Sequence, residues 1–167
     1  MEFLEKVRDI FEYFDQNIDG ILTVDDTNRM MLLVNATLGA DQGKKWFDPP
    51  CDFIKFLSRI QTLGEEITKP MFHRLTHHMR LRIKDVFYFF TNGSHQTMSE
   101  EEFLQMYSYA LKNELDWKKF YRFPCSQSEF LRSWGRLGVF EQHGILRETN
   151  KRIVKEVNSC IIRCIQI

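Results

Sequence analysis

The chain has 167 residues, and 23 lysines and arginines balance 23 aspartates and glutamates, so its formal net charge is zero. This length suits one domain or two small lobes, and 43% hydrophobic residues can fill a buried core, which excludes a disordered chain. Charge neutrality argues against a general nucleic-acid binder. The longest apolar run, residues 30–34, is too short to cross a bilayer, and the N-terminus has no signal-peptide core, so we expect a cytoplasmic protein without a transmembrane segment.

The first predicted helix carries an apolar stripe and stops at an acidic segment, residues 15–26. The stripe consists of Val7, Ile10, Phe11 and Phe14. Residues 1–26 contain eight acids and two bases, a net charge of −6, so acidity is concentrated at this end of the chain. Apolar periodicity resumes at Met30, Met31 and Val34. A helix, a 12-residue acidic loop and a second helix are the layout of an EF-hand.

The residue types in this loop suit a hard cation such as Ca²⁺, which takes six to eight oxygen ligands. Three polar side chains occupy loop positions 1, 3 and 5, and Gly20 permits the sharp turn that aims them at one point. A backbone carbonyl at position 7 and a hydroxyl at position 9 can add further oxygens. The predicted metal ligands are therefore Asp15, Asn17, Asp19, Ile21, Thr23 and Asp26.

The last loop position departs from the EF-hand pattern, because it holds Asp26 where a glutamate is usual. Aspartate is one methylene shorter and reaches a bidentate geometry less easily. We therefore expect a site that is weaker for Ca²⁺, or one that accepts the smaller Mg²⁺. The alternative is a polar turn between helices that keeps the fold and binds no metal.

The same apolar template recurs in the second half of the chain. The incoming stripe is Ile83, Val86, Phe87 and Phe90, Met98 takes the inward loop position, and the outgoing stripe is Phe103, Met106, Tyr107 and Ala110. The loop between them, residues 91–102, has Thr, Gly and His at positions 1, 3 and 5, and Glu102 alone remains as an anionic ligand. One carboxylate cannot offset the dehydration of Ca²⁺, so we expect this loop to bind no metal.

Two weaker copies complete the pattern. The spacing predicts a shortened second loop at residues 61–71, between a stripe ending at Ile60 and another that starts at Phe72, and a shortened fourth loop at residues 125–130. Neither has the acids that Ca²⁺ needs. Because EF-hands normally pair through a two-stranded ribbon between their loops, a loop without metal can be retained to support its partner.

With these motifs, the chain resembles the sarcoplasmic calcium-binding proteins and calexcitin over residues 1–140. The long connection between the first two hands, with Trp46 inside it, and the C-terminal extension favour that family over calmodulin. The resemblance implies a compact all-α protein with four EF-hands in two paired lobes. We expect an N-terminal pair at 1–80, a degenerate C-terminal pair at 81–140 and an amphipathic tail helix at 141–167. The family usually keeps two or three working loops, whereas this chain has at most one.

The tail segment, residues 147–167, has a heptad-like apolar stripe. In the resembled family such a tail packs over the hydrophobic groove, so an internal core helix is one expectation. The other is a docking helix for a partner. The predicted partner-binding residues are Ile153, Val157, Ile161 and Cys164.

The sequence contains no P-loop, GxSxG, HExxH or dinucleotide fingerprint, so we do not expect an enzyme. The four cysteines form no CxxC pair, which argues against a disulfide framework or a zinc ribbon. Our leading hypothesis is a non-enzymatic EF-hand protein with at most one Ca²⁺ or Mg²⁺ site that interacts with an unidentified protein partner. The alternatives are a metal-free EF-hand adaptor or assembly subunit, and a carrier of a small apolar ligand in the aromatic core.

Overall fold

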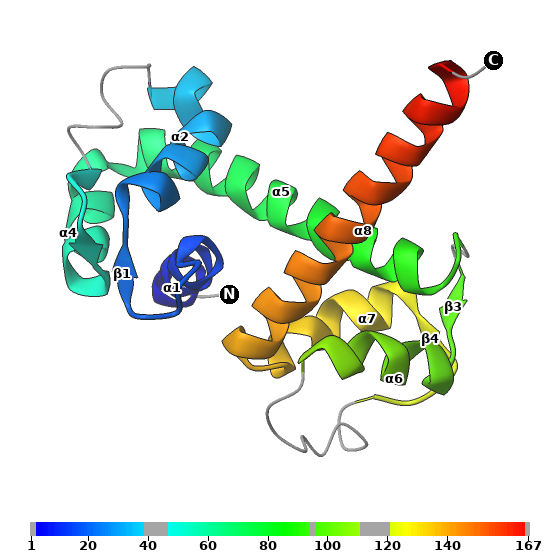
Figure 1. Ribbon diagram of the computed structural model, residues 1–167. Coiled ribbons are helices and arrows are strands. Elements are labelled where there is room, and N and C mark those ends of the chain that lie inside the picture. The colour runs from blue at the N-terminus through cyan, green and yellow to red at the C-terminus, as the bar shows by residue number, and fades with distance from the viewer. Residues whose placement is uncertain (1–2, 39–46, 94–95, 111–120, 166–167) are drawn as a thin grey trace. The chain divides into compact units, whose positions relative to one another are not determined.

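The computed structural model describes residues 3–38, 47–93, 96–110 and 121–165, and for residues 35–38, 110, 157 and 159–165 it describes the backbone alone. These residues are mainly helical, and every strand among them is two residues long (Figure 1). The predicted all-α class is therefore confirmed. Within the described residues, no helix combines the length and the apolar character needed to cross a membrane.

Two compact units, Met1–Met79 and Arg80–Ile167, divide the chain within one long helix, and each is described by itself. The first unit contains α1 (Phe3–Phe14), β1 (Ile21–Leu22), α2 (Val24–Leu38), β2 (Cys51–Asp52), α4 (Phe53–Leu63) and the first part of α5 (Glu65–Phe90). The second contains the rest of α5, β3 (Thr97–Met98), α6 (Glu100–Tyr107), a 3₁₀ turn (Ser108–Ala110), β4 (Cys125–Ser126), α7 (Gln127–Ser133), a 3₁₀ turn (Trp134–Arg136) and α8 (Val139–Ile165).

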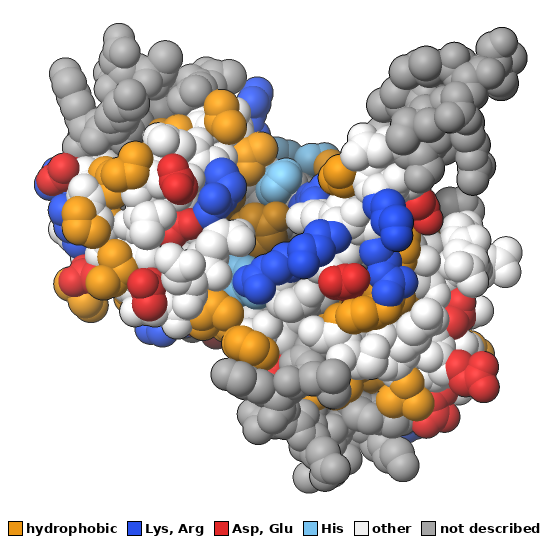
Figure 2. Space-filling model, in the orientation of Figure 1, with side chains coloured by type: hydrophobic (Ala, Val, Ile, Leu, Met, Phe, Trp, Pro, Cys, Tyr) orange, Lys and Arg blue, Asp and Glu red, His pale blue; other side chains and the backbone are white. Residues whose placement is uncertain are grey.

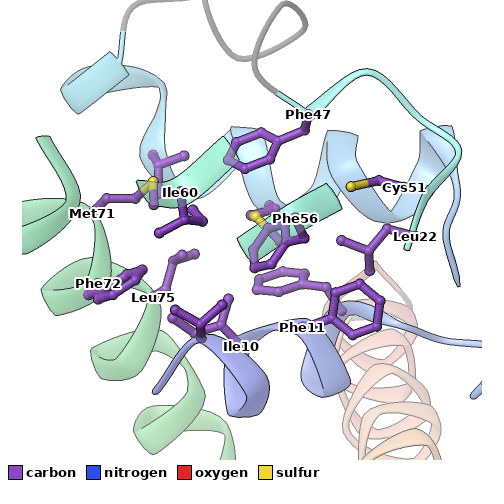
Figure 3. Packing of buried hydrophobic residues seen from close by; sticks show 14 of the residues in the cluster. Ile10, Phe11, Leu22, Phe47, Cys51, Phe56, Ile60, Met71, Phe72 and Leu75 are labelled. Atoms are coloured by element: carbon purple, nitrogen blue, oxygen red, sulfur yellow. The ribbon is translucent and has the colours of Figure 1, made fainter. Parts of the chain in front are cut away.

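The core of the first unit forms where the apolar faces of its helices meet. The stripe predicted on α1 is buried along its whole length. Phe56 of α4 lies at the centre of this cluster, with its ring centroid 5.6 Å from that of Phe11 and 5.4 Å from that of Phe47 (Figure 3). Aromatic burial of this kind supplies most of the driving force for a small unit. Phe56 thus ties α4 to α1.

The core of the second unit repeats this arrangement with other helices. Phe87 of α5 and Phe130 of α7 are fully buried, and their ring centroids are 5.5 Å apart. Phe103 of α6 contacts Tyr121 at a centroid distance of 4.5 Å. Ile145 of α8 is fully buried in the same cluster, so the start of α8 belongs to the core of this unit.

A short antiparallel ribbon stands in each unit at the same place. β1 pairs with β2 so that Leu22 lies opposite Cys51, and β3 pairs with β4 so that Met98 lies opposite Cys125. All four side chains are buried. In register, Ile21 and Asp52 of the first ribbon correspond to Thr97 and Ser126 of the second. The two units are therefore two copies of one plan.

The helix after each second strand starts with a side-chain cap. Asp52 accepts a hydrogen bond from the Lys55 backbone N–H at 2.8 Å, and Ser126 accepts one from the Glu129 N–H at 3.2 Å. Such caps stabilise a helix by satisfying one of its free N–H groups. The second strand of each ribbon therefore leads directly into the next helix, α4 in the first unit and α7 in the second.

The second loop predicted at residues 61–71 is wrong. Residues 61–63 end α4, Gly64 follows with φ of 82°, and α5 begins at Glu65. The strand that pairs with β1 precedes this region, at Cys51–Asp52. Incoming and outgoing helices carry the same apolar period, so periodicity alone does not show that the stripe around Phe56 follows its loop instead of preceding it. Similarly, most of the predicted fourth loop, residues 127–130, lies in α7.

The segment predicted as a tail, residues 141–167, lies in α8 up to Ile165. This helix begins at Val139 within the second unit, and Thr149 is only 1% exposed. Of the predicted partner-binding residues, Ile153 is half-buried in α8. The side chains of Val157, Ile161 and Cys164 lie outside the described residues. The start of α8 is thus a core helix, while the docking role of its later residues stays a prediction.

The two ribbon cysteines are expected to resist alkylation. Burial raises the pKa of both thiols, and for Cys125, with Glu129 adding to the effect, it raises the pKa to about 11. Because the thiolate is the nucleophile, little reactive form exists at pH 8. Iodoacetamide labelling of the folded protein, followed by peptide mass spectrometry, should leave Cys51 and Cys125 largely unmodified, and labelling in urea should modify both. Fast labelling in the folded state would contradict the buried ribbon.

Candidate functional site

The predicted ligand loop, residues 15–26, connects α1 to α2 and contains β1. Its tight curl depends on two residues with positive φ, Ile18 at 55° and Gly20 at 80°. Glycine adopts this conformation freely, whereas a β-branched residue does so only when the surrounding contacts impose it. The Ile18 N–H donates to the Asp15 carbonyl at 3.2 Å. The loop therefore turns back over Asp15 before it enters the ribbon.

Asp15 is a buried carboxylate with one oxygen free. Its side chain is 5% exposed, and Oδ2 accepts a hydrogen bond from the Gly20 N–H at 2.8 Å. Oδ1 is buried as well and has no hydrogen-bond partner. Buried polar atoms almost always have partners, so such an atom needs an explanation. Its carboxyl is the first of the predicted ligands.

Asp19 lies close enough to Asp15 to affect its ionisation. Burial raises the pKa of Asp15, and the hydrogen bond from the Gly20 N–H opposes the shift. Asp19 acts in both directions, because its carboxyl raises the pKa of Asp15 while its backbone N–H lowers it. Asp19 itself accepts a hydrogen bond from the Ile21 N–H through Oδ1 at 3.1 Å. Two acids held together in this way form a local concentration of negative charge, which a cation would relieve.

The other predicted ligands differ in exposure and in hydrogen bonding. Asn17 is exposed, and Ile21 lies in β1 opposite Asp52 with its side chain partly exposed. The Thr23 hydroxyl accepts a hydrogen bond from the Asp26 N–H at 3.2 Å and so caps α2. In the part of the chain that the structure describes, no three His, Cys, Asp or Glu side chains are gathered as a ready-made ion site.

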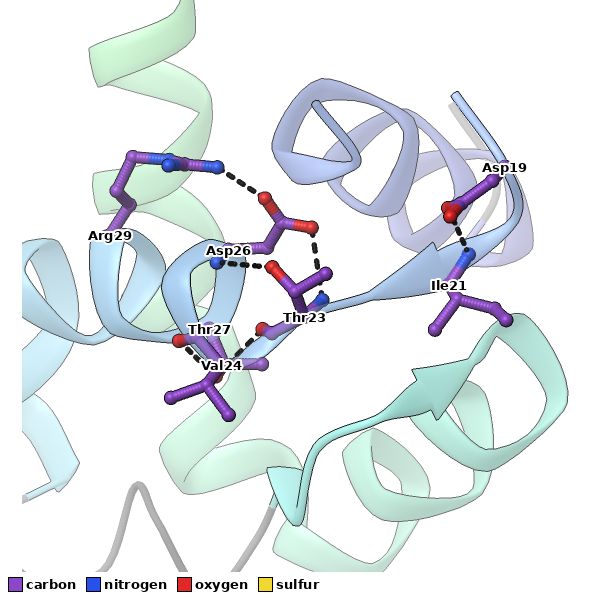
Figure 4. Close-up of polar contacts among 7 residues, drawn as sticks. All are labelled: Asp19, Ile21, Thr23, Val24, Asp26, Thr27 and Arg29. Carbon is purple, nitrogen blue, oxygen red and sulfur yellow. Dashed lines mark hydrogen bonds and ion pairs between the residues drawn. The ribbon is translucent and has the colours of Figure 1, made fainter. Parts of the chain in front are cut away.

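Asp26 has other partners. It is 2% exposed, its Oδ2 accepts a hydrogen bond from the Thr23 N–H at 3.0 Å, and its Oδ1 forms an ion pair with the Arg29 guanidinium (Figure 4). Thr23 and Asp26 thus cap the start of α2 reciprocally. The structure brings Asp15 and Asp19 together, while Asp26 is bound to its own helix.

Residues 91–102 form the loop of the second unit that corresponds to residues 15–26, with Thr91 at the first position in place of Asp15. The Thr91 hydroxyl donates to the Phe87 carbonyl at 2.7 Å, back onto the helix that precedes the loop. Glu102 and Ser99 form a reciprocal cap at the start of α6, with 2.9 Å between Glu102 Oε1 and the Ser99 nitrogen. Residues 94–95 lie outside the described residues. That this loop binds no metal stays a prediction.

One pocket bears on the carrier hypothesis. It has a volume of about 350 Å³ and lies in the second unit, between the end of α5, α6 and α8. Its lining combines the aromatic residues Tyr88, Phe89 and Phe90 with the polar and charged residues Asn92, Gln105, Arg152 and Glu156, and also includes Gly93. Charged residues in the wall do not suit a purely apolar ligand, and this pocket does not favour a carrier.

Sequence reasoning missed Arg29, which contacts a predicted ligand. Arg29 stands three residues after Asp26, and on a helix this spacing brings two side chains together. The signal was present in the sequence once α2 was expected to start near Thr23. Comparison with known proteins adds nothing to these contacts. No protein-family model, curated protein or solved structure matches the chain.

Proposed function

We propose that this chain is a non-enzymatic EF-hand-type protein with one divalent-cation site in residues 15–26 that serves a protein interaction. The buried, unpartnered Oδ1 of Asp15 carries this proposal. A buried carboxylate oxygen without a hydrogen-bond donor is costly, and a cation offsets that cost directly. The positive φ angles of Ile18 and Gly20 support it, because they turn the loop so that the Gly20 N–H reaches the other oxygen of the same carboxylate.

The remaining oxygen donors of the loop fit a hard cation. Asp19 supplies a second carboxylate beside Asp15, and Asn17, Thr23 and the Ile21 carbonyl supply neutral oxygens. When bound, the ion would neutralise the two adjacent acids and hold the loop closed. The small number of carboxylates implies a Ca²⁺ dissociation constant of about 10⁻⁴ to 10⁻³ M. In this proposal four EF-hand segments form two pairs, joined by the ribbons β1–β2 and β3–β4.

A metal-free adaptor is the second candidate, and the contacts of Asp26 favour it. This carboxylate is already satisfied by the Thr23 N–H and by Arg29. A loop whose last ligand is held by its own helix can support the ribbon without an ion. The two candidates differ in one measurable property, which is cation binding.

The interaction half of the proposal is supported by a difference between the two ribbons. Ile21, Val24 and Ile54 are 41%, 56% and 73% exposed, whereas the corresponding residues of the second unit are polar: Thr97, Glu100 and Ser128. The fold therefore does not require apolar side chains there. Over β1 and α4, at the left of Figure 2, apolar side chains lie among acidic and basic ones. Such a surface suits a partner segment that offers apolar residues flanked by charged ones.

Calorimetric titration of the full chain with CaCl₂ and with MgCl₂ tests the cation site. We expect heats that fit one site, with binding in the high micromolar to millimolar range. No heat with either ion at millimolar concentration would reject the cation site in favour of the metal-free adaptor. Affinity capture of partners with and without a chelator then shows whether the interaction depends on the ion.

A further inference from the structure

Both carboxylate oxygens of Asp26 have partners at the start of α2. Oδ2 accepts the Thr23 N–H, and Oδ1 faces the Arg29 guanidinium, as the dashed lines in Figure 4 show. A carboxylate in an ion pair with a guanidinium is partly neutralised and is a poorer ligand for a second cation. The last loop position is therefore occupied by an internal cation, the Arg29 side chain.

Arg29 can leave this position easily. Its side chain is 46% exposed, so release places the guanidinium in water at little cost, whereas Asp26 is 2% exposed and stays where it is. Release of Arg29 alone would leave the buried Asp26 charge without a counter-ion, so the exchange is favourable only when another cation takes its place. A divalent ion that also contacts Asp15 and Asp19 can thus compete for Asp26.

The second unit indicates that the fold does not need this ion pair. Glu102 corresponds to Asp26, and the residue three positions later is Gln105, an exposed amide. The reciprocal cap between Ser99 and Glu102 forms there without an arginine. Capping of the helix after the loop is therefore separable from the ion pair. Arg29 adds a positive charge at the last loop position of the first unit that the second unit does not have there.

We propose that Arg29 is a competing internal cation that sets the affinity of the loop for divalent ions. In the metal-free state it pairs with Asp26, and it must move away before Asp26 can bind the ion. This inference rests on the proposed cation site, because without that site Arg29 has nothing to compete with. It makes Arg29 a positioning residue, since it acts through Asp26. Such a loop binds a divalent cation only when the concentration of that cation is high enough to displace the arginine.

Replacement of Arg29 by glutamine, the residue at the equivalent position of the second unit, should tighten cation binding. We expect the Ca²⁺ association constant to rise by about threefold to tenfold, the range for losing one partly exposed ion pair and one nearby like charge. Arg29→Lys keeps the positive charge and should stay within about twofold of wild type. Arg82→Gln is the matched control, because Arg82 also forms an i,i+3 pair, with Asp85 at 3.5 Å, but far from this loop along the chain. Its titration should equal that of wild type.

A double-mutant cycle with Asp26→Asn, measured by thermal unfolding in chelator, isolates the ion pair without requiring cation binding. If Arg29 pairs with Asp26, the effect of Arg29→Gln on stability is smaller when residue 26 is asparagine. Cation binding by wild type with an unchanged affinity in Arg29→Gln would overturn this inference and leave the proposed site standing. Binding by Arg29→Gln alone would support it and make the wild-type loop a locked, metal-free one. Absence of binding in both would reject the cation site and this inference together, with circular dichroism showing that each variant is folded.

Discussion

Asp15→Asn is expected to abolish cation binding and to stabilise the metal-free protein. Burial and the Asp19 carboxyl raise the pKa of Asp15, so its ionised form is less stable in the folded chain than in the unfolded chain. At neutral pH the charge therefore lowers the free energy of unfolding, and asparagine removes it while keeping an acceptor for the Gly20 N–H. We expect a gain of about 1 kcal/mol in chelator.

The same substitution removes the first ligand of the site. Loss of an outer-shell partner of a metal site already weakens binding by about tenfold to a hundredfold, so loss of a ligand should leave no measurable heat at millimolar Ca²⁺. Asp25→Asn is the matched control, because Asp25 is exposed in the same loop and is not a predicted ligand. Melting curves in chelator and titrations with CaCl₂ measure the two effects. Unchanged binding by Asp15→Asn would place any cation site elsewhere.

If Asp15→Asn raises the stability but weakens cation binding, Asp15 is a functional acid and not a structural one. A structural acid lowers the stability when it is removed, whereas an acid kept for a ligand raises it. Asp26 should behave as the structural type in chelator, because it caps α2 and pairs with Arg29. Asp15 and Asp26, at the two ends of one loop, are thus expected to have different roles: Asp15 serves the ligand and Asp26 serves the stability of the fold.

The helical positions were predictable from the sequence because their signal is repeated over several turns. Val7, Ile10 and Phe14 recur at 3.6-residue spacing, and all are buried. Met98 likewise faces the core at the loop position that the template assigned to it. Periodicity shows which face of a helix is buried, but it does not show on which side of a loop that helix stands.

The second ribbon strand could not be located in this way, because two residues carry no period. What fixes Cys51–Asp52 is the pairing of Cys51 with Leu22 and the cap that Asp52 provides for α4. The partners of Asp26 were missed for a different reason. The EF-hand pattern takes each carboxylate of the loop as free to bind an ion, whereas the Thr23 N–H and the Arg29 guanidinium each hold one oxygen of Asp26.

Phe56→Ala is expected to cost the first unit about 3–5 kcal/mol of the free energy of unfolding. Phe56 is fully buried and contacts both Phe11 and Phe47, so its removal leaves a cavity at the meeting point of α1 and α4. Small domains are stable by only about 5–15 kcal/mol, so this is a large share. Urea unfolding followed by circular dichroism measures the loss. Leu32→Ala, at a residue that is 77% exposed, should change it by less than about 0.5 kcal/mol.

Phe130→Ala is the equivalent substitution in the second unit and separates stability from function. Phe130 is also fully buried, against Phe87, so a similar loss of stability is expected. At a temperature where both variants stay folded, Phe56→Ala should also weaken cation binding, because α4 follows the strand that pairs with β1 in the ligand loop. Phe130→Ala should leave the affinity unchanged. An equal loss of affinity in both variants would mean that the loop depends on general stability and not on its own ribbon.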